Sequence, residues 1–131
     1  MKYLLDTDVS IHILKRADKT LIKRVMHLPT SDFGTCSIVK AELLAGARKS
    51  QRVSENLALL QEFFGLLRSI PFDDEAAEQY GLLRAVLERA GAPIGPNDLL
   101  IASIASSHKL TLITRNRSEF RRIPGLAMEV W

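Results

Sequence analysis

The chain contains several short, continuous runs of apolar residues, which are typical of strands buried on both faces of a sheet. The run at 110–114 is the best strand candidate, because it is short and rich in β-branched residues. Pro71 interrupts one of the shorter runs, and the run nearest the carboxyl end predicts an edge strand. Strands are expected at residues 3–5, 33–36, 69–72, 110–114 and 126–131.

Between these runs, apolar residues recur three and four positions apart, which is the spacing of one face of a helix. The stripe at 76–87 predicts a helix that Asp73 or Asp74 begins and Gly91 ends. The segment after Pro96 is apolar on nearly all sides, which predicts a central, buried helix. Further helices are expected at about 9–15, 19–27, 38–47 after a Ser37 cap, and 57–67.

The order of these elements predicts the fold class. No Asn-Gly, Asp-Gly or Gly-Gly pair, the usual signature of a tight hairpin, joins two of the strands. Strands that are separated by helices indicate crossover connections, so we expect one α/β domain over residues 1–131. Its predicted architecture is a three-layer α/β/α sandwich with a short, mostly parallel sheet. Sites in such folds lie beyond the carboxyl ends of the strands, where Asp6 and the turn at 114–116 are expected.

Composition supports one globular domain and excludes several classes of protein. With 131 residues, 47% of them hydrophobic, the chain is long enough to form one core without disulfide bonds. Cys36 is the only cysteine and is expected to be a small buried hydrophobe. The apolar run before Asp6 is too short for a signal peptide, and no run is long enough for a membrane helix. A cytoplasmic location is therefore expected.

The distribution of charge is more informative than its total. The formal net charge of +3 permits a polyanionic partner without requiring one. Basic residues gather at 15–24, 48–52 and 109–122, and such runs are consistent either with solvated helix faces or with a rim that contacts phosphates. The candidate phosphate-binding residues are Lys15, Lys19, Lys23, Arg115 and Arg117.

Four acidic residues occupy positions where an ordinary surface charge is not expected. They are Asp6 at a strand end, Glu42 inside an apolar helix, Asp98 at the start of a buried helix, and Glu119 after the last strong strand. Singly, each has an ordinary explanation as a helix cap, a helix-dipole partner, a solvated residue or an ion-pair partner. Two carboxylates about 4 Å apart repel by about 4 kcal/mol at an effective dielectric of 20, so a fold that gathers them needs a compensating cation.

The chemistry of these side chains favours one class of reaction. An all-oxygen set suits Mg²⁺ or Mn²⁺ better than zinc, and the three histidines show no paired zinc spacing. A metal-bound carboxylate site in a mildly basic protein favours phosphodiester hydrolysis by an activated water. The sequence has no serine-hydrolase elbow, P-loop or zincin motif that would favour another reaction.

Four segments resemble, in order and spacing, the signature blocks of the PIN domain, and in particular those of VapC toxins from bacterial VapBC toxin–antitoxin pairs. The segments read LLDTDVSI at 4–11, IVKAELLAGA at 38–47, GPNDLLIA at 95–102 and TRNRSEF at 114–120, and the likeness covers nearly the whole chain. The resemblance implies a magnesium-dependent endoribonuclease that cuts a structured RNA, such as a transfer RNA, at a specific site. It also implies a homodimer and a VapB-type antitoxin whose carboxyl-terminal segment crosses the active-site groove.

The resemblance assigns roles to residues by position. Asp6, Glu42 and Asp98 match the acidic triad, with Asp6 and Asp98 as direct metal ligands and Glu42 bound directly or through water. Asn116 and Glu119 match the polar fourth block and complete the candidate catalytic set. The phosphate-binding candidates become candidate RNA-binding residues.

Further residues of these blocks either support the acids or depart from the family pattern. Thr7 and Thr114 are expected to orient the acids by hydrogen bonds. Asp8 stands where asparagine is common, and we favour a role as the cap of the next helix over an added charge in the site. Asn116 stands where many PIN domains have a fourth aspartate, so one-metal and two-metal mechanisms both stay open.

Two other functional classes stay open at this stage. The Asp6-x-Asp8 pattern after an apolar strand also resembles the first motif of haloacid dehalogenase-type phosphatases, with Asp6 as the nucleophile. The later lysine and acidic motifs of that family have no convincing counterpart in this chain. A catalytically idle PIN-like module that only binds RNA or protein is the second alternative, and the intact acidic triad disfavours it.

Overall fold

The computed structural model describes residues 1–131 and contains one five-stranded sheet. The strands are β1 (Tyr3–Leu5), β2 (Phe33–Cys36), β3 (Arg68–Ile70), β4 (Thr111–Thr114) and β5 (Met128–Val130). Their order across the sheet is β3-β2-β1-β4-β5, and every pairing is parallel. The predicted parallel sheet is confirmed. β1 lies between β2 and β4, so residues that follow these three strands meet at one edge of the sheet.

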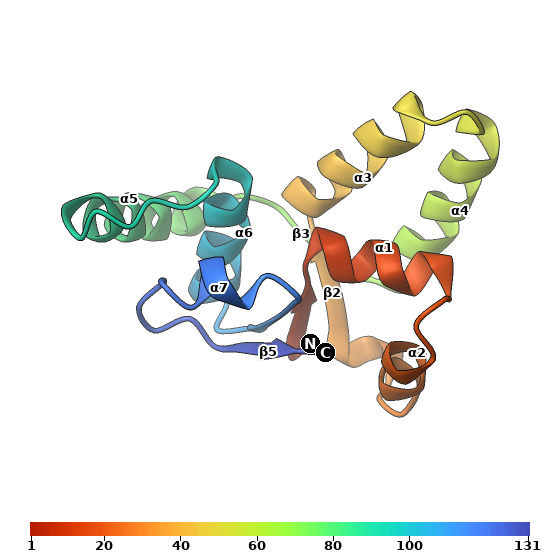
Figure 1. Ribbon diagram of the computed structural model, residues 1–131, viewed down its shortest axis with the longest axis horizontal. Helices are drawn as coiled ribbons and strands as arrows, with labels where there is room; N and C mark the ends of the chain where they lie inside the picture. Colours follow the sequence, from red (N-terminus) through yellow and green to blue (C-terminus); the bar gives the residue numbers. More distant parts are fainter.

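Seven α-helices and one short 3₁₀ helix connect the strands. They are α1 (Thr7–Lys15), α2 (Lys19–Met26), η1 (Thr30–Asp32), α3 (Ser37–Lys49), α4 (Val53–Leu66), α5 (Asp74–Arg89), α6 (Pro96–Ser107) and α7 (Arg117–Phe120). α5 and α6 lie on one side of the sheet and α1 and α2 on the other, while α3 and α4 form a hairpin that extends beyond it (Figure 1). No helix is long and apolar enough to cross a membrane.

The core has two parts because neighbouring residues of a strand face opposite sides of the sheet. A cluster of 19 buried residues joins Leu4 and Leu112 to α5, α6 and the α3–α4 hairpin. A cluster of 5 buried residues joins Leu5 and Ile113 to α1 and α2. Two apolar clusters on opposite faces of one sheet make the three layers that the sequence predicts. Cys36 is buried and free, as expected.

The helix starts show which sequence signals the fold uses. Asp73, one of two candidates, caps α5 by accepting a hydrogen bond from the N–H of Ala76 at 2.9 Å. The Ser37 cap is wrong, because Ser37 is the first residue of α3 and Cys36 precedes the helix without a side-chain cap. The cap assigned to Asp8 is wrong as well. Asp8 lies inside the first turn of α1, where its carboxylate is exposed and 3.8 Å from His12 Nε2.

Candidate active site

Asp6 lies between the end of β1 and the start of α1, and its side chain is 4% exposed. Its Oδ1 accepts a hydrogen bond from the N–H of Thr7, and its Oδ2 accepts one from Thr114 Oγ1, each at 2.8 Å. Thr114 is the last residue of β4, the neighbouring strand, which explains how two residues 108 positions apart meet. Burial raises the pKa of Asp6 and the two hydrogen bonds oppose that shift.

Glu42 reaches the same edge from α3. Its Oε1 accepts a hydrogen bond from Thr7 Oγ1 at 2.6 Å, and its Oε2 lies 3.4 Å from Asn97 Nδ2. Thr7 follows Asp6 directly and contacts both acids. Its backbone N–H donates to Asp6, and its hydroxyl group donates to Glu42. Both carboxylate oxygens of Glu42 therefore face neutral donors rather than a cation.

Asp98 lies in the first turn of α6, half-buried beside the other acids. Its pKa is raised to about 7, mainly because burial disfavours the charged form and then because Asp6 and Glu119 carry like charges. Asn116 Nδ2 lies 3.4 Å from Asp98 Oδ2. A carboxyl group with this pKa is only partly ionised near neutral pH unless a cation displaces its proton.

Glu119, on α7, is held by donors on both carboxylate oxygens. The N–H of Gly95 donates to Oε1 at 2.5 Å, and Asn116 Nδ2 donates to Oε2 at 2.8 Å. These bonds, the Gly95 bond first, lower the pKa of Glu119. A Cβ atom at position 95 would lie 3.4 Å from Glu119 Oε1 and 3.8 Å from Asp98 Oδ2, so a side chain there would enter the site. Glu119 thus ties α7 to the start of α6.

The oxygen donors at this edge fit a hard divalent cation. Asp98 interacts with Asp6, Glu42 and Glu119 strongly enough to shift its pKa, and no basic side chain is bonded to Asp6, Glu42 or Asp98. No group of three His, Cys, Asp or Glu side chains is arranged to hold a metal ion directly. Mg²⁺ is commonly held by one or two carboxylates and several waters, so two direct ligands and a water-mediated third suit this geometry.

The candidate RNA-binding residues do not form one group. Arg115 is bound to Asp18, the N-terminal cap of α2, and this contact lowers the pKa of Asp18. Arg117 is exposed at the start of α7, close to Asn116. Lys15 lies at the end of α1, in an apolar groove of about 310 Å³ that Glu42 also lines. Lys19 and Lys23 lie farther away, on the exposed face of α2.

Sequence reasoning missed three residues that the structure ties to the site. Asn97 contacts Glu42, the N–H of Gly95 binds Glu119, and Asp18 binds Arg115. Asn97 and Gly95 belong to the segment GPNDLLIA, so their place beside Asp98 was a usable signal. The partner of Arg115 lies 97 positions away, and no local pattern indicates it.

Comparison with known proteins agrees with this geometry. The sequence model of the PIN domain family matches residues 3–126. The chain is 39% identical to a tRNA(fMet)-specific endonuclease VapC from Salmonella typhimurium, over all of this chain and 98% of that protein. It is 38% identical to ribonuclease VapC2 from Rickettsia felis, with the same coverage. The crystal structure of DNA-bound VapBC from Salmonella typhimurium contains a chain that superposes with a TM-score of 0.94 at 39% identity, covering 100% of this chain and 98% of that one.

The parallel three-layer fold with carboxylates at one sheet edge defines a nuclease-type α/β domain. The chain belongs to the PIN domain family and, within it, to the VapC ribonucleases. The resemblance stated from the sequence is confirmed, and the phosphatase alternative is set aside because the matches extend over the whole chain.

Proposed function

We propose that this protein is the toxin of a toxin–antitoxin pair and hydrolyses phosphodiester bonds of RNA with the help of Mg²⁺ or Mn²⁺. The observation that carries the proposal is the group of Asp6, Glu42 and Asp98 at one edge of the sheet, where burial, and then like charge, raises the pKa of Asp98 to about 7. Such a group is costly to keep without a cation. The relatives' names, which include ribonuclease and endonuclease, support the same reaction class.

The residues of the chain have distinct tasks in this proposal. Asp6 and Asp98 would hold the ion directly, and Glu42 would hold one of its waters. A bound divalent ion supplies an activated water and stabilises the charge that develops on the phosphate. Thr114 and the N–H of Thr7 fix both oxygens of Asp6, so that this carboxylate is oriented before substrate binds. The catalytic roles of Asn116 and Glu119 stay predictions.

We propose a transfer RNA as the substrate. The Salmonella relative is named a tRNA(fMet)-specific endonuclease, and the present chain has a positive net charge of +3 that favours a polyanion. Arg117 is exposed beside the site and available to a phosphate. Arg115 contributes by holding α2 through Asp18. Phosphate contacts by Arg117, Lys15, Lys19 and Lys23 position RNA rather than cut it.

The second partner that we propose is a VapB-type antitoxin, because chains like this one occur in VapBC complexes. The groove between α1, α3 and α4 suits an apolar segment of such a protein. Its apolar lining includes Ile11, Leu14 and Leu59, and it leads to Glu42 at the site. A guanidinium group at the end of that segment could replace the charge of the metal ion beside the carboxylates. The homodimer stays a prediction.

The nuclease proposal is tested by RNA cleavage with purified protein. Wild-type protein with Mg²⁺ should cut a folded transfer RNA at one site, and EDTA should stop the reaction. Asp98→Asn should lower the rate at least about 100-fold, because it removes a ligand charge at the reacting phosphate. The matched control is Asp74→Asn, which alters an exposed aspartate in the first turn of α5 and should cleave normally.

Two outcomes would contradict the proposal. Equal cleavage by Asp98→Asn would place the chemistry elsewhere in the chain. If the protein bound RNA tightly but did not cleave it with any of the divalent ions tested, the catalytically idle binding module would be supported instead.

A further inference from the structure

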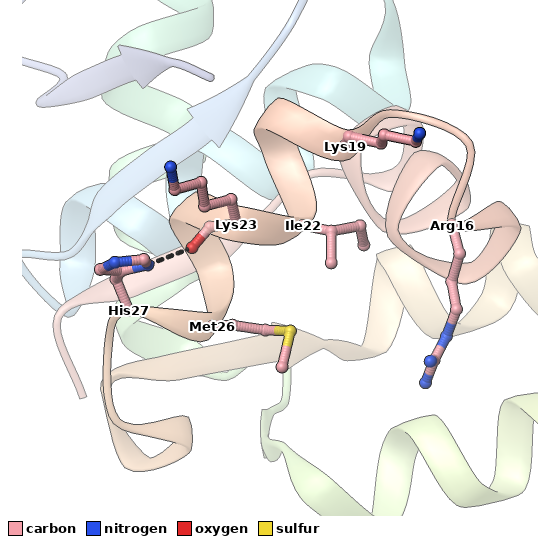
Figure 2. Close-up of a pocket in the computed structure, with 6 residues that line it drawn as sticks. All are labelled: Arg16, Lys19, Ile22, Lys23, Met26 and His27. Carbon is pink, nitrogen blue, oxygen red and sulfur yellow. Dashed lines mark hydrogen bonds between the residues drawn. The ribbon is translucent and has the colours of Figure 1, made fainter.

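The end of α1 and one face of α2 form a basic surface at a distance from the carboxylates. We call it the α2 surface, and it consists of Arg16, Lys19, Ile22, Lys23, Met26 and His27. Figure 2 shows these side chains around a shallow pocket, whose volume is about 410 Å³. None of the active-site residues lines this pocket.

The positive charge of the α2 surface is not compensated by the protein. None of the chain's ion pairs includes Arg16, Lys19 or Lys23. Asp18 is the only acidic residue between positions 15 and 24, and its carboxylate is bound by Arg115. The surface therefore presents free cations to solvent, as a site for a polyanion would.

The spacing of the charges also suits a nucleic-acid strand. Lys19, Lys23 and His27 follow one another at four-residue intervals, so their Cβ atoms form a row with steps of about 5–6 Å. His27 Nδ1 lies 2.7 Å from the carbonyl oxygen of Lys23, a contact that fixes the ring at the end of the row (Figure 2). The like charges of Lys19 and Lys23 at this spacing destabilise a helix, and the sequence keeps them here without an acidic residue between them.

Arg16 adds a second, independent observation. It ends α1 with a φ of 52°, a left-handed conformation that glycine adopts at much lower cost. Its guanidinium projects over the same pocket as Ile22 and Met26 (Figure 2). Met26 is 78% exposed, so the centre of the surface offers an apolar contact to a sugar or a base between the cations.

We propose that the α2 surface binds backbone phosphates of the RNA whose scissile bond lies at the carboxylates. This inference rests on the proposed ribonuclease function and extends it to the size of the substrate. Asp6 caps the N-terminus of α1, which has 9 residues and is followed by Arg16, so the two sites are about 14 Å apart. A folded RNA can contact both sites at once, whereas a dinucleotide, with its single phosphodiester, cannot.

The test measures RNA affinity without divalent ions, so that cleavage does not contribute. The probes are a folded transfer RNA transcript and a dinucleotide, each titrated at several salt concentrations. The variants are Arg16→Gly and Lys19→Ala/Lys23→Ala. The matched control is Lys109→Gly, because Lys109 has the same left-handed conformation, with a φ of 54°, and the same charge at the turn between α6 and β4.

The α2 variants should lose far more affinity for the folded RNA, which offers several phosphates to this surface, than for the dinucleotide, which offers one. Each lost phosphate contact should reduce the slope of log affinity against log salt by about 0.7–0.9, so the double variant should lose about 1.5 units of slope and at least about tenfold in affinity at physiological salt. Arg16→Gly and Lys109→Gly should have similar thermal unfolding midpoints, since both relieve a positive φ. Only Arg16→Gly should weaken RNA binding.

Unchanged affinity and salt slope in the double variant would overturn the proposal. An acidic peptide serves as a further probe. If the double variant kept its RNA affinity but lost binding to this peptide, the proposal would also be overturned, and the α2 surface would be assigned to a protein partner. The ribonuclease proposal fails separately, if wild-type protein binds folded RNA through this surface but does not cut it with Mg²⁺.

Discussion

At the residue scale, Asp6 is subject to two opposing influences. Burial favours its protonated form, whereas the Thr7 N–H and the Thr114 hydroxyl group favour the carboxylate. Asp98 has weaker support: Asn116 Nδ2 lies 3.4 Å from its Oδ2, and its other hydrogen-bond partner is the Glu119 carboxylate, which raises its pKa further. Burial raises the pKa of both carboxyl groups, but two donors oppose that shift at Asp6. Asp98 is therefore the group that exchanges a proton for a cation near neutral pH.

The raised pKa of Asp98 predicts a pH-dependent stability in metal-free protein. The pKa of Asp98 has its ordinary value of 3.8 in the unfolded chain and is about 7 in the folded protein. Between these two pH values, the folded protein therefore binds more protons than the unfolded chain. The free energy of unfolding therefore falls as pH rises from about 4 to about 7. Asp98→Asn removes this loss and should raise stability by about 1 kcal/mol at pH 8, after allowance for solvent screening, with no gain at pH 4.

Thermal unfolding in EDTA at the two pH values measures this difference. Asp74→Asn is again the control, because Asp74 is exposed and takes part in no ion pair. Equal midpoints for wild type and Asp98→Asn at pH 8 would show that Asp98 is ionised there at no cost.

At the element scale, the site depends on how helices meet the sheet. α1, α3, α6 and α7 each bring one or two polar residues to the edge formed by β1 and β4. Glu119 bonds α7 to the N–H of Gly95 at the start of α6, and Arg115 bonds the β4–α7 turn to the cap of α2. These contacts connect elements that are distant in sequence, so the relative positions of the helices fix the site.

The groove between α1, α3 and α4 gives a prediction for the antitoxin. Leu59→Glu places a charge on the apolar wall of the groove and should weaken the complex by about 10- to 100-fold, because the charge would be buried by the partner. Leu59 is 44% exposed, so folding should survive. Leu66→Glu is the control, since Leu66 is exposed on the same helix outside the groove.

Titration of each variant with the purified antitoxin, followed by calorimetry, gives the two dissociation constants. Equal weakening by both substitutions would point to a general effect of charge on α4 rather than to the groove.

The elements were predictable from sequence to the extent that their patterns are local. The strand at Phe33–Cys36 was predicted with its bounds, although only Phe33 and Cys36 in it are large or apolar side chains. The start of α3 was not predicted correctly. Serine is a residue type that commonly caps helices, but the cap position is occupied by Cys36, and Ser37 is the first residue of the helix. The convergence of the acids was inferred from strand ends and from resemblance. The bond between Gly95 and Glu119 depends on the packing of α6 against α7, which no periodicity encodes.

At the scale of the whole molecule, the parallel sheet separates two surfaces with opposite charge. The carboxylates gather at the edge where β1 and β4 end, and the free cations gather at the far end of α1. A divalent metal ion would offset two negative charges at the first surface and leave the second unchanged. The carboxylates should therefore repel RNA less when the ion is bound.

Binding of the ion should also stabilise the whole fold. Mg²⁺ at about 100 times its dissociation constant should add about 2.7 kcal/mol to the free energy of unfolding, because the unfolded chain has no assembled site. We expect the unfolding midpoint of wild-type protein to rise by several degrees with Mg²⁺, and that of Asp98→Asn to rise little. Differential scanning calorimetry at fixed ionic strength checks this. An equal rise in both proteins would indicate a nonspecific salt effect.

The chain carries its own optical reporter. Trp131 is the only tryptophan, and its ring packs edge-on against Tyr3 and Phe33, with ring centroids 5.3 Å and 5.7 Å away. The guanidinium of Arg24, from α2, lies over the indole at 4.6 Å from its centroid. Emission excited at wavelengths that tyrosine does not absorb therefore comes from one indole, which senses the placement of α2. A displacement of α2 by a bound partner would change the intensity and wavelength of that emission without any attached dye.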